Sequence, residues 1–264
     1  MDSGNIGFVL LCAAFVFVMT PGLAMFYGGL VRKKNVVNTM MTSIFIIGIG
    51  IVMWVLFGYS LSFAPSGNAF IGDFRWLGLE GVSLTEGYTD DASIPNMVFS
   101  AFQMMFAVIT PALITGAVAG RMKFKSIFVF TIFWSLIVYY PLAHMVWGQG
   151  GLLGADGIGA LDFAGGDVVH ISSGVSALVL CILLGKRHDY EHSIYRIHNI
   201  PKVVLGASLL MFGWFGFNAG SALAADGLAA HAFMTTGVSA AAAMLSCCLL
   251  YTSPSPRDKR QSRM

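Results

Sequence analysis

Seven long apolar stretches, almost free of charged residues, run through this 264-residue chain. They are Ile6 to Leu30, Asn38 to Phe63, Met97 to Ala119, Ile127 to Trp147, Val168 to Gly185, Val203 to Leu223 and Ala230 to Tyr251. A helix needs about 20 such residues to cross a bilayer, and stretches of this length exclude membrane strands. Charged residues make up 11% of the chain, against roughly 25% in an ordinary soluble domain. The sequence therefore predicts an all-α fold, a polytopic transmembrane helical bundle.

Basic residues gather in alternate connections between these stretches. They follow the first, third and fifth stretches: Arg32, Lys33, Lys34, Arg121, Lys123, Lys125, Lys186, Arg187, Arg196 and Lys202. By the positive-inside rule these connections are cytoplasmic, so the N-terminus is external. We expect a multi-pass protein of the cell membrane, a bacterial inner or plasma membrane, without a cleaved signal peptide. The net charge of +2 gives no reason to expect a nucleic-acid partner.

The composition changes abruptly after Leu250, to Ser, Pro and Arg. The run from Cys248 to Asp258 is similar to the translation of a widely used sequencing-library adapter. We therefore expect residues 1–247 to be an incomplete transmembrane domain and residues 248–264 to be a non-native tail. The alternative is a native basic tail on the cytoplasmic side.

Polar groups cluster where the fifth stretch begins. Asp162 and Asp167 are placed to cap the helix there or to interact with its dipole, and Gly165-Gly166 permits close packing. His170 lies nearly one turn inside the helix. Ionisable groups at membrane depth are rare and usually functional, although a neutral histidine bonded to a neighbouring helix is the alternative.

Two helical faces carry rings and hydroxyls at spacings of three or four residues. These are Trp214, Phe217 and Ser221 in the sixth stretch, and Phe102, Phe106 and Thr110 in the third. Aromatic faces can hold a cation, with about 0.5 to 2 kcal/mol from each ring. Taken alone, such stripes are more often part of a packed core than of a binding site. The pair Gly216 and Gly220 indicates only that another helix approaches closely.

Other chemical motifs are weak. The glycine-rich segment from Gly148 to Gly159 lacks a G-x-G-x-x-G pattern, so nucleotide binding is not supported. His188 and His192 could bind a metal if their loop were helical, but with His198 and several charges nearby a solvated loop is the preferred interpretation. The cysteines, all inside apolar stretches, are predicted to be packing residues: Cys12, Cys181, Cys247 and Cys248. We predict no metal, no cofactor and no enzymatic activity.

Five motifs occur in a characteristic order. They are Met19 to Gly29 with Arg32 to Asn35, Phe102 to Ala107, Ala143 to Gly148, Asp162 to Ile171, and Trp214 to Ser221. In this order they resemble the ammonium transporter family, which includes the Amt, MEP and Rh proteins, over Ile6 to Cys247. The resemblance implies ammonium or ammonia transport by a homotrimer, with a PII-type regulatory protein as a candidate partner. The alternative is an ammonium sensor with little transport.

The resemblance also assigns a conduction pathway. Phe106, Trp147 and Ser221 would recruit ammonium at the external mouth, and Phe106 with Phe217 would form a gate below it. Rings and a hydroxyl that partly replace the water around the ion fit this role. Beyond the gate the ion would lose a proton, and ammonia would pass along an apolar, histidine-lined pore.

The remaining site residues support this pathway. By the resemblance, His170 matches the first of two pore histidines, where it would guide ammonia or relay the proton, and Asp162 supports the mouth. Three others match nearby pore or vestibule positions: Phe102, Tyr139 and Trp214.

Three departures from the family pattern matter. Gly120 replaces a common Glu, and Asp167 replaces a small or hydroxyl residue three positions before His170. The family usually has eleven spans, built as two inverted five-span halves plus one, and this chain holds about seven. The second pore histidine would lie in the tenth span. We therefore expect the native protein to conduct ammonium and this fragment not to.

Overall fold

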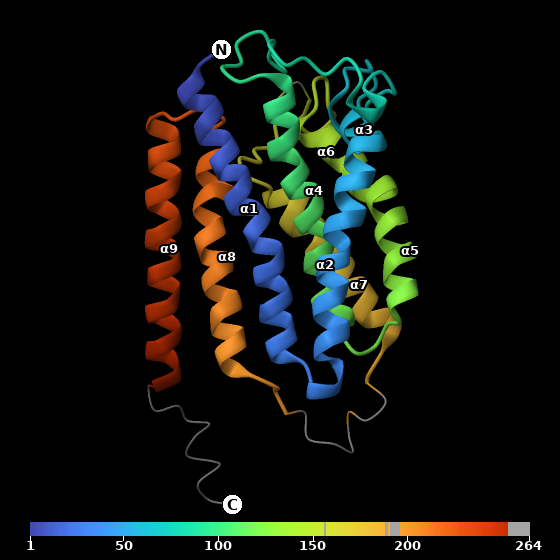
Figure 1. Ribbon diagram of the computed structural model, residues 1–264, viewed down its shortest axis with the longest axis vertical. Helices are drawn as coiled ribbons and strands as arrows, with labels where there is room; N and C mark the ends of the chain where they lie inside the picture. Colours follow the sequence, from blue (N-terminus) through green and yellow to red (C-terminus); the bar gives the residue numbers. More distant parts are fainter. Residues whose placement is uncertain (156, 188–189, 191–195, 253–264) are drawn as a thin grey trace, which may run out of the picture.

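The computed structural model describes residues 1–155, 157–187, 190 and 196–252, and in these residues every regular element is helical (Figure 1). The α-helices are α1 (Ser3–Leu30), α2 (Val36–Met53), α3 (Tyr59–Phe63), α4 (Asn96–Val118), α5 (Phe124–Trp134), α6 (Tyr140–Trp147), α7 (Ser172–Leu184), α8 (Ile200–Gly220) and α9 (Gly227–Thr252). Seven helical stretches of this part are long and apolar enough to cross a membrane. The predicted helical bundle is confirmed.

Three of the seven stretches contain a π-helical turn, which the sequence did not predict. These turns are η2 (Trp54–Gly58), η4 (Ser135–Tyr139) and η5 (Gly166–Ile171). The first joins α2 to α3, the second joins α5 to α6, and the third leads into α7. A π-helical turn admits one extra residue and so shifts the face on which the following side chains lie. Two shorter 3₁₀ turns, η1 (Lys33–Asn35) and η3 (Leu77–Leu79), lie in connections.

Glycines allow α1 and α8 to pack against each other along much of their length (Figure 1). A Cβ at Gly206 would lie 2.6 Å from the Gly22 carbonyl oxygen, and one at Gly220 would lie 2.6 Å from Cβ of Cys12. Gly216 likewise faces α1, so the predicted close approach at Gly216 and Gly220 is confirmed. Close approach matters in lipid because van der Waals contact, not exclusion of water, holds such helices together.

Opposite charges gather at opposite ends of the bundle. The described carboxylates lie at the end that carries the N-terminus, and many of them belong to the long connection between α3 and α4 (Figure 1). Among the described Lys and Arg residues, Arg75 alone shares that end. Arg75 forms an ion pair with Asp73 at 2.7 Å, and this bond lowers the pKa of the Asp73 carboxyl. The remaining described basic residues follow α1, α4 and α7 or begin α8, in the alternating pattern that the sequence shows.

The connection between α3 and α4 packs over its end of the bundle through aromatic rings. Tyr88 stacks on Phe99 of α4 with ring centroids 4.8 Å apart, and Trp76 stacks on Tyr59 at 5.4 Å. The Gln149 backbone N–H, just beyond α6, donates to the Tyr88 hydroxyl at 3.1 Å. These contacts fix the connection beside the end of α6.

The structure describes all four cysteines, but it does not describe the histidine pair of the connection after α7. All four cysteines are free thiols, and Cys12 is buried between α1 and its neighbours. Cys247 and Cys248 are exposed instead, because α9 packs chiefly on α8 and presents its other faces outward. The proposed His188 and His192 pair lies outside the described residues.

The close packing of α1 against α8 predicts that one added methyl group lowers the stability of the bundle considerably. In Gly206→Ala the new Cβ would meet the backbone of α1, so we expect the helices to separate and the free energy of unfolding to fall by about 1 to 3 kcal/mol. Gly174→Ala is the matched control, since Gly174 is also helical but has no atom within 4 Å of a built Cβ. Thermal unfolding in a neutral detergent measures the stability of both variants. Equal unfolding midpoints would show that the contact between α1 and α8 at Gly206 does not stabilise the bundle.

Candidate functional site

A contiguous group of aromatic rings joins α4, α6 and α8. The ring centroids of Phe106 and Phe217 lie 4.4 Å apart, and each side chain is only 1% exposed. Trp147, the last residue of α6, meets Phe106 edge-on at 6.2 Å, and Phe102 meets it at 4.9 Å. The structure therefore brings together residues that are up to 115 positions apart in the chain, from Phe102 to Phe217.

His170 extends this group of rings. Its imidazole stacks on Trp214 at 5.6 Å with an interplanar angle of 10°, and on Phe217 at 5.9 Å. The π-helical turn η5 carries His170, whose residue is exposed while Phe106 and Phe217 are buried. The imidazole thus contacts two rings of α8 while the residue remains exposed. The consecutive contacts run Trp147, Phe106, Phe217, His170.

Asp162 fixes the start of the π-helical turn. Its carboxylate accepts backbone N–H groups from four successive residues, Gly165, Gly166, Asp167 and Val168, the last three at 2.8, 2.8 and 3.0 Å. These are the N–H groups that a helix start leaves without partners inside the helix. Capping by Asp162 is therefore confirmed, whereas the structure gives no such bond to the part-buried Asp167 carboxylate.

The backbone of Asp162 also positions the aromatic group. Its carbonyl oxygen accepts the indole N–H of Trp147 at 2.9 Å. Gly165 follows with φ of +105°, a conformation in which a Cβ would lie 2.6 Å from Cγ2 of Val169. One acidic residue thus links the start of the His170 turn to the ring that meets Phe106.

Ser221 ends α8 close to a cavity of about 410 Å³. Its hydroxyl donates to the Phe217 carbonyl oxygen at 2.9 Å. Trp147, Asp91 and the residues directly after Ser221 line the cavity, which lies at the acidic end of the bundle. Sequence analysis missed Asp91 and Tyr88 as parts of this site, although the acidic character of their connection was a usable signal. A cavity beside carboxylates and rings favours a cation.

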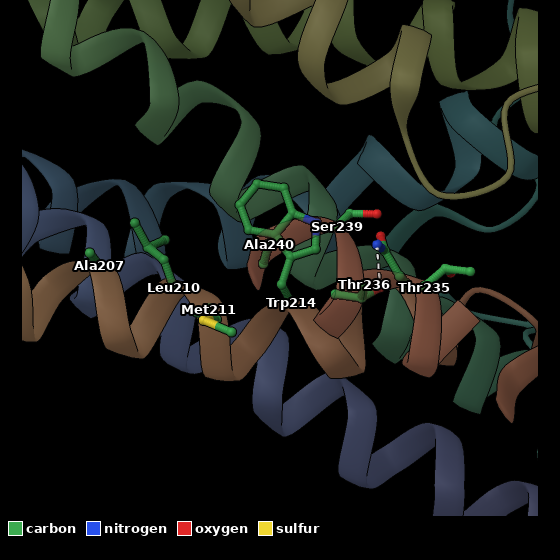
Figure 2. A pocket seen from close by; sticks show the side chains of 9 residues that line it. Ala207, Leu210, Met211, Trp214, Thr235, Thr236, Ser239 and Ala240 are labelled. Atoms are coloured by element: carbon green, nitrogen blue, oxygen red, sulfur yellow. Dashed lines mark hydrogen bonds between the residues drawn. The ribbon is translucent and has the colours of Figure 1, made fainter. Parts of the chain in front are cut away.

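A groove of about 540 Å³ lies between α8 and α9 on the other side of Trp214. Figure 2 shows Trp214 of α8 beside Thr236 and Ser239 of α9. The Asn218 amide donates to the Thr236 hydroxyl at 2.8 Å and ties the two helices together. Trp214 therefore both lines this partly polar groove and contacts the imidazole of His170.

Tyr139 is not a member of the stack of rings. It is 1% exposed in the turn η4, and its aromatic neighbours among the described residues are Trp134 and Tyr140. Its hydroxyl forms a hydrogen bond with Thr110, one turn along α4 from Phe106.

His144 has contacts unlike those of His170. It is completely buried, and its Nδ1 and Nε2 lie 3.1 Å and 2.8 Å from the carbonyl oxygens of Ser62 and Asn68. His144 therefore ties α6 to the end of α3 and to the connection that follows it. The sequence did not predict these two carbonyl partners.

The contacts of His144 and His170 predict that replacing each by alanine lowers the free energy of unfolding by a different amount. His144→Ala removes the buried ring whose two nitrogens contact the carbonyl oxygens of Ser62 and Asn68, so we expect the free energy of unfolding to fall by about 1 to 3 kcal/mol. His170→Ala, the matched control, removes only ring stacking at an exposed position and should cost less. Thermal unfolding of the purified variants gives the comparison, and a larger loss for His170→Ala would contradict these assignments.

The cap formed by the Asp162 carboxylate predicts a local loss of stability when Asp162 is replaced. Asp162→Ala leaves four N–H groups without their acceptor, and we expect the free energy of opening at residues 165–168 to fall by about 1.5 to 3 kcal/mol. Hydrogen exchange of a peptide covering this turn measures the loss. Asp167→Ala is the control and should leave the exchange of the turn nearly unchanged; equal acceleration in both variants would reject the cap.

Comparison with known proteins agrees with this geometry. The model of the Ammonium Transporter Family matches residues 7–255. An ammonium transporter of Bacillus subtilis is 53% identical over 242 residues, which are 92% of this chain and 58% of the relative. The crystal structure of Saccharomyces cerevisiae Mep2 superposes with a TM-score of 0.75 and 37% identity, over 85% of this chain and 50% of Mep2.

A structure named Sensor Amt Protein is similar too, with a TM-score of 0.81, 28% identity and coverage of 94% of this chain and 62% of that one. The chain thus spans little more than half the length of the relatives that it matches. The match to the family model and the identity to the bacterial relative lead to the same conclusion: this chain belongs to the ammonium transporter family.

Proposed function

We propose that the protein to which this chain belongs moves ammonium or ammonia across a cell membrane. The observation that carries the proposal is the unbroken contact of Trp147, Phe106, Phe217 and His170. This path leads from a cavity at the acidic end to an imidazole at membrane depth. Relatives named ammonium transporters support the same function and give no reason to expect an enzyme.

Recruitment takes place at the cavity beside Trp147. Ammonium sheds part of its hydration only if other groups replace it. Trp147 on the cavity wall supplies a ring face, and we place the lone pairs of Ser221 and the ring of Phe106, which Trp147 contacts, just beyond it. The Ser221 hydroxyl proton is directed at the Phe217 carbonyl, so its oxygen remains an acceptor for the ion. Asp91, on the cavity wall, adds negative potential.

Below the mouth, Phe106 and Phe217 act as the gate. Their buried rings touch, so passage requires them to move apart. An apolar passage strongly disfavours a charge, so ammonium is expected to give up its proton beyond the gate and to continue as ammonia. His170, stacked directly behind Phe217, then accepts or donates one hydrogen bond to ammonia or relays the proton.

The assembly and the regulation of the whole protein belong to the same proposal. The chain covers 58% of the Bacillus subtilis relative, and the accessible face of His170 would meet a pore wall supplied by the rest of the protein. We propose a homotrimer in a bacterial inner or plasma membrane that takes up nitrogen, with a PII-type protein as its regulatory partner. The family resemblance is the support for these points.

Flux through the gate tests the proposal. In the protein expressed from its complete reading frame, Phe217→Ala should change methylammonium uptake at least about tenfold, because it removes one of the two gate rings and uncovers His170. Phe215→Ala is the matched control, since Phe215 lies two residues away on α8 and stacks on Phe233 of α9 instead. His170→Ala should alter flux or proton coupling more than His144→Ala does, per folded molecule. Equal effects of the two ring variants would reject the gate.

Sensing is the second candidate function, favoured by the similarity to the structure named Sensor Amt Protein. The same uptake assay separates the two functions. A sensor would bind ammonium saturably and show uptake close to that of empty vesicles. Transport at rates that depend on Phe217 would exclude a purely sensory role.

A further inference from the structure

The first turn of α1 is bonded to two connections that lie far apart in the sequence. The backbone N–H of Asp2 donates to the Ser93 carbonyl oxygen, in the connection between α3 and α4, at 2.8 Å. The Asn5 side-chain oxygen Oδ1 accepts the backbone N–H of Ala225, in the connection between α8 and α9, at 2.8 Å. Figure 1 shows the start of α1 at the same end of the bundle as both connections. One short segment therefore ties the two connections together.

Both of these connections line the cavity of about 410 Å³ beside Trp147. Ser93 and Ile94 contribute to it from the first connection, and residues 222–224 contribute from the second. Residue 222 directly follows Ser221, whose hydroxyl is placed in the recruitment step. The bonds made by the start of α1 therefore act on the walls of the cavity where recruitment is proposed.

The turn that follows α8 contains a strained residue. Leu223 has φ of +58°, in the left-handed region that residues with a side chain rarely adopt. The N–H groups of Ala222 and Leu223 donate to the carbonyl oxygens of Ala219 and Gly220 at 3.2 and 2.9 Å. Strained conformations of this kind persist only where the surrounding contacts hold them. The turn thus depends on contacts beyond its own backbone bonds.

Three contacts hold this turn. The Leu223 side chain packs, partly buried, against the main hydrophobic core. Asp226 caps α9, since its Oδ1 accepts the Ala229 N–H at 2.9 Å. Between these two positions, the bond from Ala225 to Asn5 connects the turn to α1. Asn5 is itself held, because its backbone N–H donates to the Asp2 carboxylate at 2.8 Å.

We infer that Asn5 is a positioning residue for cation recruitment, which fixes the turn after Ser221 and with it the cavity wall beside Trp147. The inference rests on the transport proposed above. Without the bond to Ala225 the strained turn can relax, so the groups that replace the water around the ion are held less firmly and bind it more weakly. The ring gate and His170 lie beyond this turn. The maximal rate of transport should therefore depend on Asn5 much less than the affinity does.

The concentration dependence of methylammonium uptake tests the inference, in the protein expressed from its complete reading frame. Asn5→Ala removes the acceptor of the Ala225 N–H, and we expect KM to rise about threefold to tenfold with little change in the maximal rate per folded molecule. Asn5→Asp keeps an acceptor oxygen and should restore KM. Asn68→Ala is the matched control: Asn68 lies at the same end of the bundle, and its Oδ1 accepts the Phe70 N–H at 2.8 Å, outside the cavity.

Hydrogen exchange of a peptide covering residues 222–226, in the purified 264-residue chain, gives a readout that does not depend on transport. Asn5→Ala should accelerate this exchange, and Asn68→Ala should leave it unchanged. Unchanged exchange or an unchanged KM in Asn5→Ala, or an equal rise of KM in Asn68→Ala, would overturn the inference. If the unchanged protein shows no uptake, the transport proposal fails, and faster exchange in Asn5→Ala alone would still support the role of Asn5 in fixing the turn.

Discussion

The hydrocarbon core offers no water to a polar group, and the structure depends on this constraint throughout. A polar group at that depth must find its partner in the chain or line a hydrated cavity. The Asn218 amide meets Thr236 across two helices, and the buried imidazole of His144 lies between two carbonyl oxygens. His170 differs because it is exposed, and its ring contacts are with Trp214 and Phe217. This contrast is the reason for placing His170, rather than His144, in the proposed pathway.

The position of the ring stack follows from a few contacts made outside the membrane-spanning helices. Asp162 holds the π-helical turn with its carboxylate and holds Trp147 with its carbonyl oxygen. The turn then sets the direction of the His170 ring, and Trp147 sets one side of Phe106. Because α1 and α8 approach so closely at their glycines, Phe217 is placed with little freedom against Phe106. A small number of polar bonds thus orients several apolar groups.

The sequence predicted the helices well because composition alone identifies membrane spans. It also named Phe106, Phe217 and His170, which the structure places in contact, by resemblance and by helical spacing. It did not predict the π-helical turns, since an extra residue in a turn leaves no mark in an apolar pattern. Nor did it predict the partners of His144, because they are carbonyl groups about 80 positions away in the chain. Backbone partners of this kind have no residue signature.

The separation of charge along the bundle gives the two ends different chemistry. Asp91 lines the cavity near Trp147 and raises the local concentration of cations there, whereas five basic residues line a cavity at the opposite end. A neutral molecule that crosses between them experiences no net force from this field, whereas a cation leaving toward the basic end is repelled. In the transport proposed above, this charge pattern favours the passage of ammonia over that of ammonium, independently of the apolar gate. The ring stack and the charge asymmetry of the described residues are two separate reasons for that proposal to exclude the charged form.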